Sequence, residues 1–223
     1  MNEEKSENTL YHILSAAFCV IVVMSNIISA KMIKLPFFAD SCIPAGLLTY
    51  PLTFLISDLV TEIFGAKKAK SMVYIAFGMN LLGFAILYAA LRLPAISMVD
   101  ERAFQAVLGL SGLRIFSSLT AFLAAQIVDI QLYALIKRWT GEHHLWLRNN
   151  ASTCVSQIVD TVAIDILYLF WGLGMGMEQV LPIMLISYAY KAFCSFANTP
   201  LFYLSVFLVK FKWRSLFQTA NAT

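Results

Sequence analysis

Long apolar runs separated by short polar connections occupy most of the chain. A bilayer core of about 30 Å requires roughly 20 apolar residues of helix. Runs of that length lie near 10–30, 43–63, 71–91, 113–136, 153–173 and 181–209. They lack the period-two alternation of membrane β-strands. The pattern therefore predicts an all-α integral membrane protein, a six-transmembrane-helix bundle over 10–209, with polar tails at 1–9 and 210–223.

The composition agrees with a membrane protein. The chain is 60% hydrophobic and 13% charged, whereas a soluble domain is about half apolar and a quarter charged. Its formal net charge of +3 is too small to indicate a nucleic-acid partner. The four cysteines form no C-x-x-C pair, and His143 and His144 have no third ligand nearby in the sequence. We therefore expect neither a metal site nor a cofactor.

The basic residues that flank the spans predict the orientation. One side holds Lys5, Lys67, Lys68, Lys70, Lys137, Arg138, Arg148, Lys210, Lys212 and Arg214, which makes ten, and the other holds Lys31, Lys34, Arg92, Arg102 and Arg114, which makes five. Cytoplasmic connections carry the excess of Lys and Arg. We therefore expect both tails, including the basic C-terminal one, to be cytoplasmic.

Several charged residues lie inside the predicted spans, where each costs about 2.5–3.5 kcal/mol at a helix centre. They are Asp58, Glu62, Asp129, Asp160, Asp165 and Lys191. So many charges in one small bundle indicate a polar site in its interior. The alternative is that they only join helices through hydrogen bonds, which contribute less than about 1 kcal/mol each on average.

The spacing of these residues places them in pairs on single helix faces. Asp58 and Glu62 are four residues apart, and the segment QIVD occurs twice, at 126–129 and 157–160. Each pair therefore lies on one face of its helix. The helical rise puts Asp58, both QIVD aspartates and Lys191 in a layer roughly 10 Å deep. We predict that Asp129 and Asp160 face each other across a central pocket, beside Gln126 and Gln157.

The chemistry of these side chains favours a flat polar ligand. A carboxylate accepts two hydrogen bonds side by side, and a glutamine amide offers a donor and an acceptor, which together match the edge of a guanine-like base. The excess of acids favours a neutral or cationic ligand. Aromatic side chains near the same depth, including Tyr50 and Phe54, could stack on its ring, although aromatics are also ordinary packing residues in membrane bundles.

Five segments, in order, resemble the queuosine precursor transporters, also called the vitamin uptake transporter family. These segments are SNIISAK at 25–31, YPLTFLISDLVTEIFGAKKAK at 50–70, QIVDIQLY at 126–133, LWLRNNASTCVSQIVDT at 145–161, and the stretch from Lys191 to Pro200. The resemblance implies import of 7-deazaguanine bases, such as prequeuosine-0, prequeuosine-1 or queuine, for tRNA modification. It also implies a multi-pass protein of the bacterial inner membrane whose fold is similar to the substrate-binding components of energy-coupling-factor transporters.

With this resemblance, the candidate substrate-binding residues are Asp58, Glu62, Gln126, Asp129, Gln157, Asp160, Lys191 and Asn198. The expected partners are the small-molecule substrate and membrane lipid, and a homodimer is compatible with the sequence. A second hypothesis is a substrate-capture subunit energised by a separate ATPase, since the chain has no G-x-x-x-x-G-K-[ST]. An enzyme is not expected, because H-E-x-x-H and G-x-S-x-G are both absent. The sequence leaves the energy source open.

Overall fold

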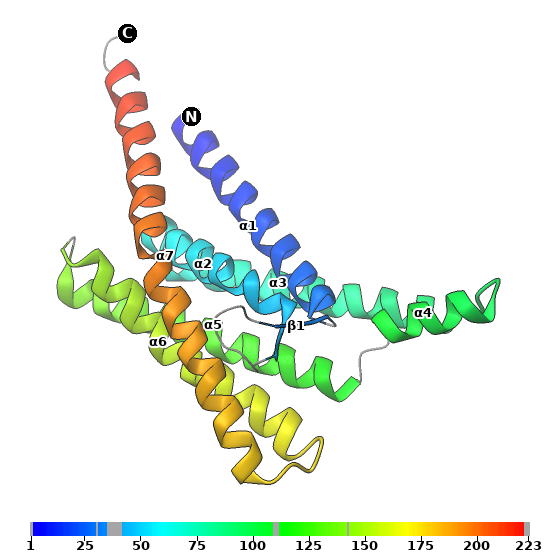
Figure 1. Cartoon of the computed structure of the whole chain (residues 1–223). Helices are drawn as coiled ribbons and strands as arrows, with labels where there is room; N and C mark the ends of the chain where they lie inside the picture. Colours follow the sequence, from blue (N-terminus) through cyan, green and yellow to red (C-terminus); the bar gives the residue numbers. More distant parts are fainter. Residues whose placement is uncertain (1, 30, 35–41, 109–111, 142, 221–223) are drawn as a thin grey trace.

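A computed structural model of the chain describes residues 2–29, 31–34, 42–108, 112–141 and 143–220. The protein is almost entirely helical (Figure 1). Its elements are α1 (Asn2–Ile28), β1 (Met32–Lys34), β2 (Cys42–Pro44), the 3-10 helix η1 (Ala45–Leu48), α2 (Tyr50–Phe64), α3 (Ala66–Leu91), α4 (Met98–Leu108), α5 (Gly112–Thr140), α6 (Leu145–Ile164), the π-helix η2 (Asp165–Phe170) and α7 (Met177–Ala220). The strands β1 and β2 form one short antiparallel pair.

Among the described residues, five helices are long and apolar enough to cross a membrane. They cover Glu7–Ile28, Ala66–Leu91, Arg114–Thr140, Leu145–Phe170 and Met177–Val209. The sixth predicted run, 43–63, is divided between β2, η1 and α2. At 15 residues, α2 is about 22 Å long, which is shorter than a bilayer core.

Proline explains where the second run divides. Pro44 caps η1, and Pro51 lies in the first turn of α2. Proline is favoured in a first turn because its missing N–H would have no partner there. Pro51 therefore lies at the start of α2 and not inside a longer helix. The α7 helix, by contrast, continues through both Pro182 and Pro200.

The helix α4 lies in a stretch that the apolar pattern treats as a connection, and it extends away from the other helices (Figure 1). Its start is capped by Ser97, whose hydroxyl accepts a hydrogen bond from the Asp100 N–H at 3.1 Å and donates to the Asp100 carboxylate at 2.6 Å. Such a Ser-x-x-Asp signature is recognisable in a sequence. The signal for α4 was therefore present, although its apolar content was too low to suggest a span.

The distribution of polar residues is the reverse of that in a soluble protein. Leu82, Ile86, Leu185 and Phe207 are among the many large apolar side chains that are exposed. The buried residues of α6, by contrast, are all polar: Arg148, Asn149, Asn150, Ser152, Thr153, Ser156, Gln157, Asp160 and Thr161. They recur at the helical spacing of three and four. Apolar side chains face the lipid, and polar and charged residues of a membrane bundle face its interior. Here they share that interior with apolar clusters, such as the one that contains Phe18 and Val60.

The helix α1 packs tightly against η1 at Gly46. The Ser25 hydroxyl donates to the Gly46 carbonyl at 3.0 Å, and the Ser29 hydroxyl donates to the Ser25 carbonyl at 2.7 Å. A Cβ atom at position 46 would lie 2.0 Å from the Ser29 Oγ and 2.3 Å from the Ser25 carbonyl oxygen. Ser25, Ser29 and Gly46 therefore form a close contact between α1 and η1.

We expect Gly46→Ala to destabilise the protein by at least about 1–3 kcal/mol, because the added methyl group must displace backbone. Thermal unfolding in detergent measures the effect. The control is Gly78→Ala on exposed α3 surface, where a Cβ meets no atom within 4 Å. Equal unfolding temperatures for the two variants would show that the contact at Gly46 is looser than described.

Candidate functional site

A buried ion pair lies where α2, α6 and α7 converge. The Lys191 Nζ is 2.5 Å from the Asp160 Oδ2 and donates to the Thr161 hydroxyl at 3.1 Å. It also lies 5.1 Å from the centre of the Tyr50 ring, over its face. Lys191 is only 7% exposed and Asp160 only 5%. Removing one partner from such a pair is strongly destabilising, since the other is left as an uncompensated buried charge.

A large cavity of about 380 Å³ reaches this ion pair from one end of the bundle. That volume is within the range of small-molecule binding sites. The lining combines charged, polar and aromatic side chains, among them Asn26, Tyr50, Arg114, Ser118, Asp160, Asp165, Tyr168 and Lys191. The segments that line it come from the last turns of α1, the start of α2, the start of α5, the end of α6, η2 and the first half of α7.

A small cavity of about 20 Å³ lies on the other side of Lys191, with room for about one water molecule. Gln157, Lys191 and Asn198 line it, together with Tyr50 and Phe54. The Asn198 amide donates to the Pro51 carbonyl at 2.8 Å. The Gln157 Oε1 is buried and has no hydrogen-bond partner within the described part of the chain. Four of the eight predicted site residues therefore lie at the two cavities.

The other QIVD segment is not in either lining. The Asp129 Oδ1 accepts a hydrogen bond from the Ser156 hydroxyl at 3.1 Å. Its carboxyl group also lies within hydrogen-bonding reach of Asp58, although no donor of good geometry reaches either Asp58 oxygen among the described residues. Both side-chain polar atoms of Gln126 are likewise buried without a partner there. The Asp129 side chain, on α5, thus lies between α2 and α6. Of the two QIVD aspartates, only Asp160 lines a cavity.

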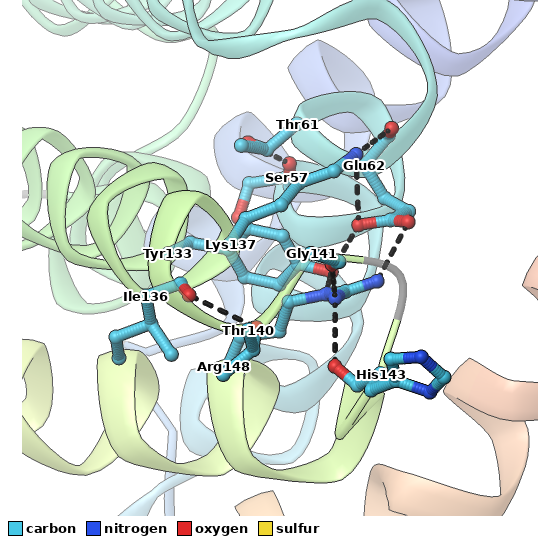
Figure 2. Close-up of polar contacts among 10 residues, drawn as sticks. All are labelled: Ser57, Thr61, Glu62, Tyr133, Ile136, Lys137, Thr140, Gly141, His143 and Arg148. Carbon is cyan, nitrogen blue, oxygen red and sulfur yellow. Dashed lines mark hydrogen bonds and ion pairs between the residues drawn. The ribbon is translucent and has the colours of Figure 1, made fainter.

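Glu62 lies in a separate buried network, shown in Figure 2. Its carboxylate is 2.8 Å from the Arg148 guanidinium and 3.2 Å from the Lys137 ammonium, and it accepts a hydrogen bond from the Tyr133 hydroxyl at 3.0 Å. Arg148 also donates to the Gly141 and His143 carbonyl oxygens. The network therefore joins α2, α5 and α6 to the connection between α5 and α6.

The network and the large cavity occupy opposite ends of the bundle. Glu62 is near the end of α2, Lys137 near the end of α5 and Arg148 near the start of α6. The cavity is lined by the opposite end of each of these helices. One end of the bundle interior is therefore hollow, and the other is closed by charged side chains.

Sequence reasoning placed Arg148 in an exposed connection and counted it among the flanking basic residues. The structure corrects this: Arg148 is 1% exposed and lies inside α6. The available signal was its register, because Arg148 continues the polar stripe formed by Ser152 and Ser156. Asp165 and Asn26 were also absent from the predicted site, although both line the large cavity. The Asn26 side-chain amide donates to the Asn80 side-chain Oδ1 at 2.8 Å.

The fold and the site define a multi-pass membrane protein with a ligand-sized cavity in its interior, lined by apolar side chains together with charged and polar ones. The chain belongs to the family described as "Putative vitamin uptake transporter", whose model matches residues 44–205. It is also 33% identical over 118 residues to the "Probable queuosine precursor transporter" of Bacillus subtilis (strain 168). That alignment covers 52% of this chain and 52% of the relative. No solved structure matches the chain.

Proposed function

We propose that the protein imports a queuosine precursor, a 7-deazaguanine base, across the bacterial inner membrane for use in tRNA modification. The observation that carries this proposal is the large cavity that reaches the buried Asp160–Lys191 pair. A flat base in the cavity would meet an acceptor, Asp160, and a donor, Lys191, side by side. The family and the relative's name support transport of this kind of solute.

The candidate binding residues fall into two groups. We assign ligand contact to Asp160 and Lys191, which line the large cavity, and to Gln157 and Asn198, which a ligand would meet deeper in the bundle. The remaining candidates are Asp58, Glu62, Gln126 and Asp129, which lie outside both linings. For these, contact requires the bundle to rearrange during transport. Gln126 is suited to such a step, because its buried amide has unused hydrogen-bonding capacity among the described residues.

The positions of the cavity and the network suggest how passage is controlled. If both tails are cytoplasmic, the large cavity faces outward and the network of Glu62, Lys137 and Arg148 closes the cytoplasmic end. This orientation can be tested with a reporter enzyme that works only outside the cytoplasm, fused after Thr223. Activity of that fusion would overturn the orientation. Release into the cell then requires the network to separate, as in alternating access by bundle rearrangement. The Asp160–Lys191 pair marks the limit of entry in the closed arrangement.

We also propose that η1 and α2 together make a sixth crossing. Non-helical backbone is tolerated within a bilayer where it lines a cavity, and Gly46, Leu47 and Tyr50 line the large one. The transmembrane domain would then cover 10–209, as the sequence predicts, with a fold similar to energy-coupling-factor binding components. Because such components work with a separate ATPase, this similarity also supports the second hypothesis, in which the chain is a substrate-capture subunit.

Uptake of labelled prequeuosine-0, prequeuosine-1 and queuine into proteoliposomes containing only this chain tests the proposal. We expect accumulation of at least one base above the level in empty liposomes. An imposed proton gradient in a parallel sample identifies the energy source. Binding without accumulation would favour the capture subunit. Failure both to bind and to accumulate any of the three bases would contradict the proposal.

A further inference from the structure

The large cavity contains a second acid, Asp165, that the ion pair does not neutralise. Asp165 is 8% exposed, and its Oδ2 is buried with no hydrogen-bond partner in the described part of the chain. Lys191 and Asp160 are charged groups that act on it electrostatically. Lys191, however, makes its ion pair with Asp160. Asp165 therefore lines the cavity with hydrogen-bonding capacity that no partner in the described part of the chain uses.

The position of Asp165 follows from the helical register. Thr161, Asp165 and Tyr168 lie on one face at spacings of four and three, and all line the large cavity. Asp165 is also the first residue of the π-helix η2. Hydrogen bonds from the Trp171 N–H to the Ile166 carbonyl and from the Leu173 N–H to the Tyr168 carbonyl, each five residues apart, show the wider turn. Such π-helical segments are frequent at functional sites.

The other charged group of the cavity lies on another wall. The Arg114 guanidinium donates to the Ser29 carbonyl at 2.6 Å, at the junction of α5 and α1. The two acids in the lining, Asp160 and Asp165, differ in their surroundings. Asp160 has a cation at contact distance, whereas no ion pair within 4 Å is formed by Asp165 among the described residues. A buried carboxylate without such a partner is best satisfied by a cation or a strong donor on the ligand.

We propose that Asp165 binds an ammonium group on the transported ligand and so selects amine-bearing bases over neutral ones. This inference rests on the proposed function. Prequeuosine-1 and queuine carry an aminomethyl nitrogen that is protonated at neutral pH, whereas prequeuosine-0 carries an uncharged nitrile at the same ring position. Asp160 and Lys191 would hold the ring, which both classes share. Asp165 would contact the substituent, which differs between them.

The test measures the ratio of prequeuosine-1 uptake to prequeuosine-0 uptake in proteoliposomes. We expect Asp165→Asn to lower this ratio about tenfold or more, because a charge-assisted hydrogen bond is lost. Asp165→Glu should preserve the preference for the amine. The matched control is Glu178→Gln, which removes an exposed acid at the start of α7 outside the cavity lining. Its ratio should equal that of the unmodified protein.

The outcomes separate this inference from the proposed function. If the unmodified protein takes up the bases but Asp165→Asn leaves the ratio unchanged, the inference fails and the proposed function stands. Equal loss of both substrates in the Asn and Glu variants would assign Asp165 a structural role and also overturn the inference. If the unmodified protein neither binds nor takes up any base, the proposed function fails and the inference fails with it.

Discussion

Lys191→Met is expected to abolish uptake and to lower stability by about 3–5 kcal/mol, because it leaves the Asp160 carboxylate buried without its cation. Asp160→Asn should also lower both uptake and stability, but to a smaller extent. The double variant, with both substitutions, should regain most of the lost stability because neither member of the pair is then left as a buried charge without its partner. It should still not transport, since the donor and acceptor for the ligand are both changed. Thermal unfolding in detergent and uptake into proteoliposomes measure the two effects separately.

The control for this series is Lys67→Met, which removes an exposed lysine at the start of α3. It should retain stability and uptake. Recovery of uptake by the double variant would contradict ligand binding by Asp160 and Lys191. The pair would then have a structural role only. Unchanged stability of Lys191→Met would contradict the buried ion pair itself.

Arg148→Met is expected to be at least as destabilising as Lys191→Met. It removes the guanidinium from Glu62, which keeps its contacts with Lys137 and Tyr133, and it also removes the donors to the Gly141 and His143 carbonyl oxygens. Arg148→Lys should be intermediate, because an ammonium keeps the charge but cannot reproduce the fork of guanidinium donors. Thermal unfolding of the purified variants measures the order of their stabilities.

Arg138→Met is the matched control, because Arg138 is exposed near the same end of α5. A stability for Arg148→Met equal to that of Arg138→Met would show that the network does not hold the closed end together. If all Arg148 variants fold normally but release a preloaded base faster, the network closes the bundle without stabilising it.

The polar stripe of α6 shows how much of the site the sequence could predict. Spacing alone places Asn149, Ser152, Ser156, Gln157 and Asp160 on one face, and all are buried. Spacing along one helix, however, does not determine which neighbour each residue meets. Lys191 could have balanced either QIVD aspartate, and packing decides for Asp160. For the same reason, the sequence could not predict that Asp129 faces Asp58 outside the cavities.

The second apolar run shows why the helices were predicted only in part. Its composition suggests a full span, but η1 and α2 divide it at Thr49. Hydropathy measures apolar content and does not register that Pro44 and Pro51 favour helix starts. The short helix α4 was missed for the opposite reason, because its N-cap at Ser97 is a local signal without a long apolar run.

Substrate protection of a single cysteine in the large cavity tests the central claim most directly. In a protein whose native cysteines are replaced, Ser187→Cys places a thiol in the cavity lining. We expect a membrane-impermeant maleimide to label it from outside the cell, and prequeuosine-1 or queuine to slow that labelling. Val99→Cys on α4, where Val99 is 76% exposed, should be labelled equally with and without the base. Labelling of the Ser187→Cys variant that is unaffected by all three bases, or that occurs only from the cytoplasmic side, would contradict an outward-facing binding cavity.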